Sequence, residues 1–238
     1  TALEVAGALP RQHAFELVET MAQYQVGNVV GAQLLYPLVD ADWRPWPSPE
    51  LDVILGDTPG VYHSIRLGGQ AVLGGTREAI DHLARALPPR KVGDRDAPMV
   101  LPLHSAFHTP LMAPTRERAQ RDLGHLAFQA PAVPLVDGRG AVYWPRHADP
   151  AALRDYTLGA QVTETYDISL GLVTALRELA PDHLVLLGPG GNLGGPVGQV
   201  LAREGWAGTH DKASFAARQS SAPLVLAMNR PEQRALVT

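Results

Sequence analysis

Two short strand-like stretches separated by a pair of glycines restrict the fold of this chain more than any other feature. Val61 to Leu67 and Gln70 to Leu73 are typical of strands, and Gly68-Gly69 between them suits a hairpin turn. The sequence therefore predicts an antiparallel strand pair, which needs further strands or a helix to be stable.

The segments around this hairpin predict those partners. We expect a strand within residues 26–38, a short helix near residues 51–55, a helix that begins after the N-cap Thr76, and a strand over residues 100–103. Strand, helix, two strands, helix, strand is the order of a ferredoxin-like unit of about 75 residues. Because the patterning on either side differs, this unit is predicted to be an insert.

The regions outside the insert predict an α/β layer. Helical spacing is present over residues 10–21, 112–123, 149–158 and 168–179. His183 to Leu187 resembles a buried strand, and a glycine-rich turn and a helix with Val197, Val200 and Leu201 follow it. Strand, glycine turn and helix in that order indicate a parallel sheet with helices packed on it.

Bulk properties exclude several classes of function. The formal net charge of -4 gives no electrostatic support for nucleic acid or an anionic membrane as a partner. There is no cysteine, which excludes disulfides, thiolate metal sites and cysteine nucleophiles. No apolar run approaches the roughly 20 residues of a transmembrane helix, and the first residues lack the pattern of a signal peptide. We therefore expect a cytoplasmic protein that binds neither nucleic acid nor membrane.

The stretch LPLHSAFHTPLM, residues 101–112, holds the main candidate for chemistry. A short strand leads into a loop with two histidines, and a histidine at a strand end can act as a general base because its usual pKa lies near 6.5. A purely structural loop histidine is the alternative that position alone favours. A zinc site at His104 and His108 is a weaker alternative, since no third ligand is evident; we expect no metal.

The residues around His108 resemble the malonyl-CoA:acyl-carrier-protein transacylase family, and the resemblance covers essentially the whole chain. In that family a histidine with Leu-Met shortly after it is the catalytic base, as in His108-Thr109-Pro110-Leu111-Met112 here. Further similar elements occur in the family's order: Thr1-Ala2-Leu3 with Ala6-Gly7, then GQAVLGG at 69–75, FQAP at 128–131 and LGPG at 187–190.

This resemblance implies a fold and a site. The fold is a parallel-sheet, α/β-hydrolase-like acyltransferase core, formed by residues 1–25 and 104–238, with residues 26–103 as the inserted ferredoxin-like subdomain. His108 is the expected base, and the backbone carbonyl of Gln161 is expected to orient its ring. Phe107, just before the histidine, resembles the residue of malonyl-selective members that fills the space of an α-methyl group.

The sequence departs from the family at the nucleophile. The family's serine lies in a Gly-x-Ser-x-Gly turn between a strand and a helix, and no such pentapeptide occurs in this chain. We therefore expect an upstream segment or a second chain to supply the serine.

A second departure concerns the acyl group. Malonyl-selective members hold the free carboxylate with an arginine, and the aligned position here is Met21. Either the protein does not select a dicarboxylic acyl group, or another cation has taken over. Arg66 is the candidate cation, with a solvated strand arginine as the alternative.

The function implied by the resemblance is transfer of a malonyl or similar short acyl group from coenzyme A to the phosphopantetheine thiol of an acyl carrier protein. Malonyl-CoA and the carrier protein are thus the expected partners, and no further cofactor is expected. Two alternatives stay open: an acyl-thioester hydrolase on the same fold, and a carrier-protein-binding module without catalytic activity.

Overall fold

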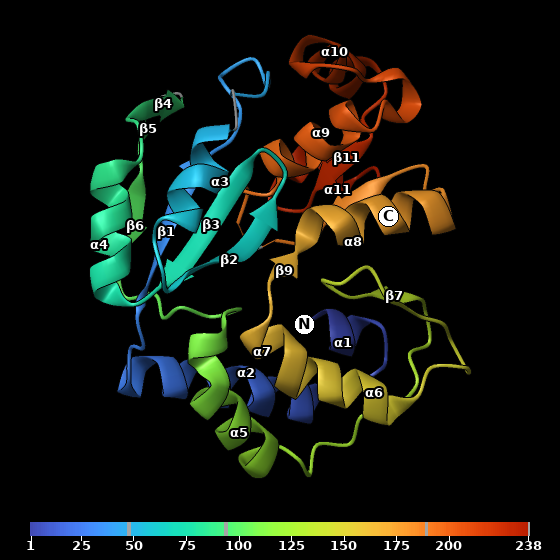
Figure 1. Ribbon diagram of the computed structural model, residues 1–238. Helices are drawn as coiled ribbons and strands as arrows, with labels where there is room; N and C mark the ends of the chain where they lie inside the picture. The colour runs from blue at the N-terminus through green and yellow to red at the C-terminus, as the bar shows by residue number, and fades with distance from the viewer. Residues whose placement is uncertain (47–48, 93–94, 189, 238) are drawn as a thin grey trace.

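The computed structural model describes residues 1–46, 49–92, 95–188 and 190–237 and is shown in Figure 1. The helices are α1 (Ala2–Val5), α2 (Arg11–Gly27), α3 (Pro49–Gly56), α4 (Arg77–Ala86), α5 (Ala113–Asp122), α6 (Pro150–Asp155), α7 (Gln161–Thr163), α8 (Ile168–Leu179), α9 (Gly194–Arg203), α10 (Lys212–Ser221) and α11 (Pro231–Arg234). Three shorter helical segments are η1 (Pro110–Met112), the π-helical η2 (Tyr156–Ala160) and η3 (Trp206–Gly208). The strands are β1 (Ala32–Pro37), β2 (Val61–Leu67), β3 (Gln70–Gly75), β4 (Arg90–Val92), β5 (Arg95–Ala97), β6 (Met99–Leu101), β7 (Leu135–Val136), β8 (Val142–Tyr143), β9 (Tyr166–Asp167), β10 (Leu184–Leu186) and β11 (Val225–Ala227).

The predicted hairpin forms the centre of the largest sheet. β2 and β3 pair in antiparallel fashion and are joined at Gly68-Gly69, where Gly68 has φ +58°. The strand order β6-β1-β3-β2, with β1 antiparallel to both β3 and β6, is the order of a ferredoxin-like unit. The fold class predicted from the sequence is thus confirmed, with a short β4–β5 hairpin added before β6.

A fifth strand, which the sequence did not predict, joins this sheet from the later part of the chain. β9 pairs with β2 in parallel, with Ile65 opposite Tyr166 and Arg66 opposite Asp167. The two-residue strand is too short for a hydrophobic pattern to reveal. It ties the ferredoxin-like sheet to the segment that leads into α8.

Helices α3 and α4 cover the apolar face of this sheet. Ile80 and Leu83 of α4 are fully buried against Leu34 and Leu73 in the main cluster of the subdomain. Thr76 caps α4 by accepting the N–H of Ala79 at 3.2 Å, as the sequence indicated.

The first strand begins later than predicted. Helix α2 continues to Gly27, and β1 starts only at Ala32. Val26 and Val29 are 87% and 44% exposed, so this valine-rich stretch does not enter the sheet. The chain turns at Gly31, which has φ +68°, and then enters β1. The subdomain boundaries 1–25, 26–103 and 104–238 stay a prediction.

The C-terminal layer contains the parallel strands β10 and β11, with α8 and α9 packed beside them (Figure 1). The prediction that residues 183–187 form a buried strand is wrong in its burial, because Val185 and Leu187 are 38% and 64% exposed. Within the described residues β10 pairs only with β11, so one of its edges has no neighbouring strand. Pro189 lies outside the described residues, so the glycine-proline-glycine turn stays a prediction.

The helix predicted over residues 149–158 is present, but its hydrogen-bonding pattern changes along its length. α6 begins at Pro150 after the N-cap Asp149, becomes π-helical at Tyr156 and continues through η2 into α7. This widened turn carries Gln161 to the loop that holds His108. Among the described residues, no helix combines the length and apolar character needed to cross a bilayer.

Candidate active site

The loop between β6 and η1 is fixed by hydrogen bonds to the segment before β1. Ala106 donates its N–H to the carbonyl of Val30 at 2.7 Å, and the Ser105 hydroxyl accepts the N–H of Val30 at 3.1 Å. The fully buried Thr109 donates its hydroxyl to the Ala106 carbonyl at 2.6 Å. Hydrogen bonds therefore fix the loop both before His108, at residues 105–106, and after it, at Thr109.

His108 has an unusual backbone conformation that two later residues stabilise. Its φ of +62° lies in the left-handed region, which a residue other than glycine seldom adopts. Its N–H donates to the carbonyl of Val162 at 2.9 Å, and its ring Nδ1 is hydrogen-bonded to the carbonyl of Gln161. Because a carbonyl only accepts, Nδ1 carries the proton and Nε2 is the basic nitrogen.

The peptide group before His108 is held from the ferredoxin-like sheet. Ser64 on β2 donates its hydroxyl to the carbonyl of Phe107 at 2.8 Å, and Gln33 on β1 donates from Nε2 to the same carbonyl at 3.3 Å. The Gln33 amide also donates to the Ser64 hydroxyl at 2.8 Å. Both side chains are buried, so these bonds are shielded from competing water.

His108 lines a cavity of about 420 Å³, and the described residues around it lie within 1–21 and 107–166. One wall is formed by α1 and α2 and includes Met21, and Phe107 and Gln161 lie on the histidine side. Further lining residues come from β7, β8, α6 and η2. Within the described residues, Nε2 of His108 has no hydrogen-bond partner, which leaves it available to a group in this cavity.

Burial keeps the imidazole neutral. Desolvation lowers the pKa of His108 below 6.5, although the hydrogen bond to the Gln161 carbonyl opposes this shift. The ring stacks on Tyr166 with centroids 5.4 Å apart and planes 29° from parallel. A neutral, oriented imidazole with one free nitrogen can accept a proton from a hydroxyl or a thiol.

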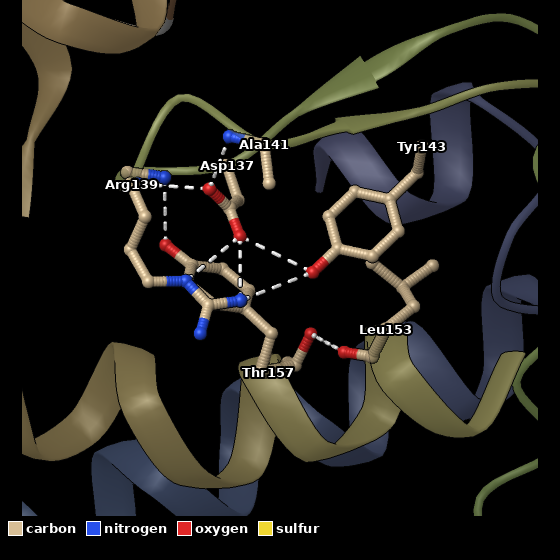
Figure 2. A network of polar contacts seen from close by, with 8 residues as sticks. Asp137, Arg139, Ala141, Tyr143, Leu153 and Thr157 are labelled. Carbon is tan, nitrogen blue, oxygen red and sulfur yellow. Dashed lines mark hydrogen bonds and ion pairs between the residues drawn. The ribbon is translucent and has the colours of Figure 1, made fainter. Parts of the chain in front are cut away.

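A buried carboxylate, that of Asp137, also lines the cavity. Figure 2 shows the polar groups around it. Asp137, with a side chain only 2% exposed, accepts backbone N–H groups from Arg139 and Ala141 at 2.8 and 3.0 Å. It also accepts the Tyr143 hydroxyl at 3.1 Å and the guanidinium of Arg139 at 2.9 Å. The guanidinium lies over the ring of Tyr156, with its central carbon 4.7 Å from the ring centroid.

Four of the five residues predicted for the site meet at this cavity: Met21, Phe107, His108 and Gln161. The structure does not bring Arg66 there. Its side chain is 57% exposed on β2 and lies 3.5 Å from the carboxylate of Asp167. The roles of all five residues stay predictions.

His104, the other histidine of the loop, is exposed and points to the Pro102 carbonyl at 2.7 Å. Among the residues that the structure describes, no three histidine, aspartate or glutamate side chains gather as metal ligands do.

The sequence did not predict the residues that support the site. Gln33 and Ser64 lie on strands whose patterns predicted only packing. The Asp137-Gly138-Arg139-Gly140 stretch is a turn signal of the kind that precedes a strand, and it could have revealed the β7–β8 hairpin. Nothing in the local pattern of Tyr166 marks it as a partner of His108.

Comparisons with known proteins bear on the fold. No protein-family model matches the sequence, and no curated protein matches it. The structure is similar to an acyl-carrier-protein S-malonyltransferase from Burkholderia pseudomallei 1710b, with TM-score 0.71 and 21% identity over 100% of this chain and 69% of that one. A malonyl-CoA:acyl carrier protein transacylase from Xanthomonas oryzae gives TM-score 0.71 and 23% identity over 99% and 67% of the two chains.

A third similar structure is a type II polyketide synthase acyl carrier protein in complex with its malonyl-transacylase. It gives TM-score 0.65 and 21% identity over 84% of this chain and 62% of that one. At these identities the agreement concerns the fold, which is the one that the sequence motifs indicated. This chain has the fold of the acyl-carrier-protein malonyltransferases, over about two thirds of the length of the first two of these proteins.

Proposed function

We propose that this protein is an acyltransferase that moves a malonyl or similar short acyl group from coenzyme A to the phosphopantetheine thiol of an acyl carrier protein. The observation that carries the proposal is the state of His108: Nδ1 is bound to the Gln161 carbonyl, and the basic Nε2 is free at a cavity. The similar structure of a malonyl-transacylase with its acyl carrier protein supports such a protein as the acceptor.

In the proposed mechanism, His108 serves both halves of the reaction. Its Nε2 takes the proton of a serine hydroxyl as the serine oxygen attacks the thioester carbonyl. The imidazolium then gives this proton to the departing coenzyme A thiolate, which leaves an acyl-serine ester. In the second half, Nε2 takes the proton of the carrier thiol as its sulfur attacks the ester, and returns it to the serine oxygen.

The serine in this mechanism comes from a segment upstream of Thr1 or from a second chain, because residues 1–238 contain no Gly-x-Ser-x-Gly turn. Gln161 fixes the tautomer of His108, and Phe107 limits the space beside it. The proposed reaction takes place in the cytoplasm and requires no cofactor beyond the coenzyme A thioester and the phosphopantetheine of the carrier.

Two other functions compete with this proposal. Hydrolysis of an acyl thioester on the same fold would use the same histidine with water as the acceptor, and Met21 in place of a carboxylate-binding arginine favours this alternative. A carrier-protein-binding module without catalytic activity would need no serine, and the absence of a Gly-x-Ser-x-Gly turn from this sequence favours that one.

The test starts with the coding sequence upstream of Thr1, where we expect a Gly-x-Ser-x-Gly turn. The polypeptide with its upstream residues is then incubated with labelled malonyl-CoA and acetyl-CoA, with and without carrier protein. We expect label on the carrier, and we expect His108→Ala to reduce its transfer by about 10²-fold or more. His104→Ala is the matched control and should leave transfer unchanged, because His104 is exposed and lies off the cavity.

Each competing function has its own outcome in this assay. Free acid that accumulates regardless of carrier protein would establish the hydrolase. Carrier binding without turnover, together with no serine turn upstream or in a partner, would establish the binding module.

A further inference from the structure

The charge of the cavity beside His108 bears on which acyl group it can hold. Among the described residues that line it there is no lysine or arginine. An acyl group with a terminal carboxylate would therefore meet no side-chain cation among the described lining residues.

One lining residue, Asp137, is itself an anion. Its carboxylate is fixed by two backbone N–H groups, Tyr143 and Arg139, as Figure 2 shows. Arg139 does not line the cavity, and its guanidinium already binds Asp137 through Nε and an Nη at 3.2 and 2.9 Å. The carboxylate of a ligand would compete with Asp137 for Arg139, and the negative charge of Asp137 would repel it.

Burial also shifts the titratable side chains that line the cavity towards their neutral forms. Burial lowers the pKa of His108 and raises the pKa values of Tyr143, Tyr156 and Tyr166, and the charge of Asp137 raises those of all three tyrosines further. Each shift favours the neutral form of the group. The same environment penalises a ligand carboxylate that has no partner.

Arg66 does not remedy this deficit. It is exposed, it is absent from the cavity lining, and it pairs with Asp167, which also caps α8 by accepting the N–H of Leu170 at 2.8 Å. The position of the family's arginine is Met21 here, and Arg66, the candidate replacement, does not line the cavity.

We infer that the cavity accepts an uncharged, apolar acyl group and discriminates against one that ends in a carboxylate. This inference rests on the proposed function, in that it takes the cavity beside His108 as the acyl site. The ligand class is a short saturated acyl thioester of coenzyme A, whose alkyl chain would lie against Met21, Leu17 and Val18 of α2.

The test compares two ligands of nearly the same shape. Isovaleryl-CoA carries an isopropyl group where malonyl-CoA carries its carboxylate, and free coenzyme A controls for the nucleotide part. Dissociation constants are measured by calorimetry on the chain, and the His108 ring signals are followed by NMR. We expect isovaleryl-CoA to bind at least about tenfold more tightly than malonyl-CoA and to shift the His108 signals.

Three variants make the charge argument specific. Met21→Arg should reverse the preference, since it adds a carboxylate-binding group to the wall. Asp137→Asn should reduce the preference for isovaleryl-CoA over malonyl-CoA, because it removes the negative charge at the cavity and keeps the shape of the side chain. It replaces Met21→Arg as the test if that variant does not fold. Arg66→Ala should change neither affinity.

The failures of the two proposals differ in this experiment. The inference is wrong if malonyl-CoA binds as tightly as isovaleryl-CoA, or if Arg66→Ala abolishes the binding of malonyl-CoA. Either result would still be compatible with the proposed acyltransferase. If neither acyl-CoA binds better than coenzyme A and the His108 signals do not move, the acyl site itself is wrong, and both proposals fall.

Discussion

Ser64→Ala removes one oxygen atom from the support of His108, and its effect can be estimated from the structure. The hydroxyl is fully buried, donates to the Phe107 carbonyl at 2.8 Å and accepts from Nε2 of Gln33 at 2.8 Å. A buried hydrogen bond contributes about 0.5–1.5 kcal/mol net, so the loss of two should lower the free energy of unfolding by about 2 kcal/mol. The Phe107 carbonyl would retain only the longer bond from Gln33, at 3.3 Å.

The assay is urea unfolding combined with NMR of the His108 ring. We expect a lower midpoint at an unchanged slope, because the alanine alters stability and not the surface exposed on unfolding. We also expect the ring signals of His108 to shift, because the carbonyl of the peptide group before this residue keeps only the longer of its two hydrogen bonds.

The matched control is Ser169→Ala. Ser169 is also buried, but it accepts a single backbone N–H, that of Gly68 at 2.7 Å, at the hairpin end of the sheet. The Ser169→Ala variant should lower the free energy of unfolding by about 1 kcal/mol and leave the ring signals of His108 unchanged. The reasoning is refuted if Ser64→Ala costs less than about 0.5 kcal/mol, or if the two variants move the His108 signals equally.

Two further predictions concern pH and the start of β1. Burial lowers the pKa of His108, so below pH 6.5 the unfolded chain binds more protons than the folded chain. The contribution of His108 to the free energy of unfolding is therefore highest above pH 6.5 and decreases as the pH falls towards the pKa of His108 in the folded protein. Urea midpoints from about pH 8 to about pH 5 should show this slope, and His108→Gln should reduce it; an equal slope in the variant contradicts the assignment. Gly31→Ala should destabilise by more than about 2 kcal/mol, since the residue has φ +68° and an added Cβ would lie 2.3 Å from the Gly75 carbonyl oxygen. Gly27→Ala, where an added Cβ meets nothing within 4 Å, should be neutral or stabilising by up to about 1 kcal/mol, and similar losses in both variants would contradict the reasoning.

The fold could be predicted from the sequence where local signals and tertiary contacts agree. Gly68-Gly69 gives a turn between two apolar stretches, and Thr76 gives a helix start, so the hairpin and α4 follow from short segments. The prediction is wrong at residues 26–31 because valine enrichment marks strand preference, whereas pairing decides strand formation. β9 could not be predicted, because two residues carry no period and their partner lies on β2, about a hundred positions earlier.

The candidate site divides in the same way. His108, Phe107 and Gln161 were identified because they resemble family elements, and they meet at one cavity. The hydrogen bonds of Asp137 could not be predicted, because an aspartate in a turn is usually solvated. Only in the folded chain do Tyr143 and the guanidinium of Arg139 donate hydrogen bonds to its carboxylate. Burial of a polar group results from packing between distant segments, so the sequence alone does not reveal it.

The backbone of His108 shows why the loop sequence alone favoured a structural role. A non-glycine residue at φ +62° is uncommon, and glycine would adopt this conformation at a lower energetic cost. The conformation persists because the N–H, the ring and the preceding carbonyl of His108 are each held by a different part of the chain: Val162, Gln161, and Ser64 with Gln33. A glycine could adopt the same backbone conformation without these contacts. Their specific effect is therefore to hold the imidazole ring of His108 in one orientation. A histidine that only filled the loop would need neither a fixed tautomer nor a free nitrogen at a cavity, and His108 has both.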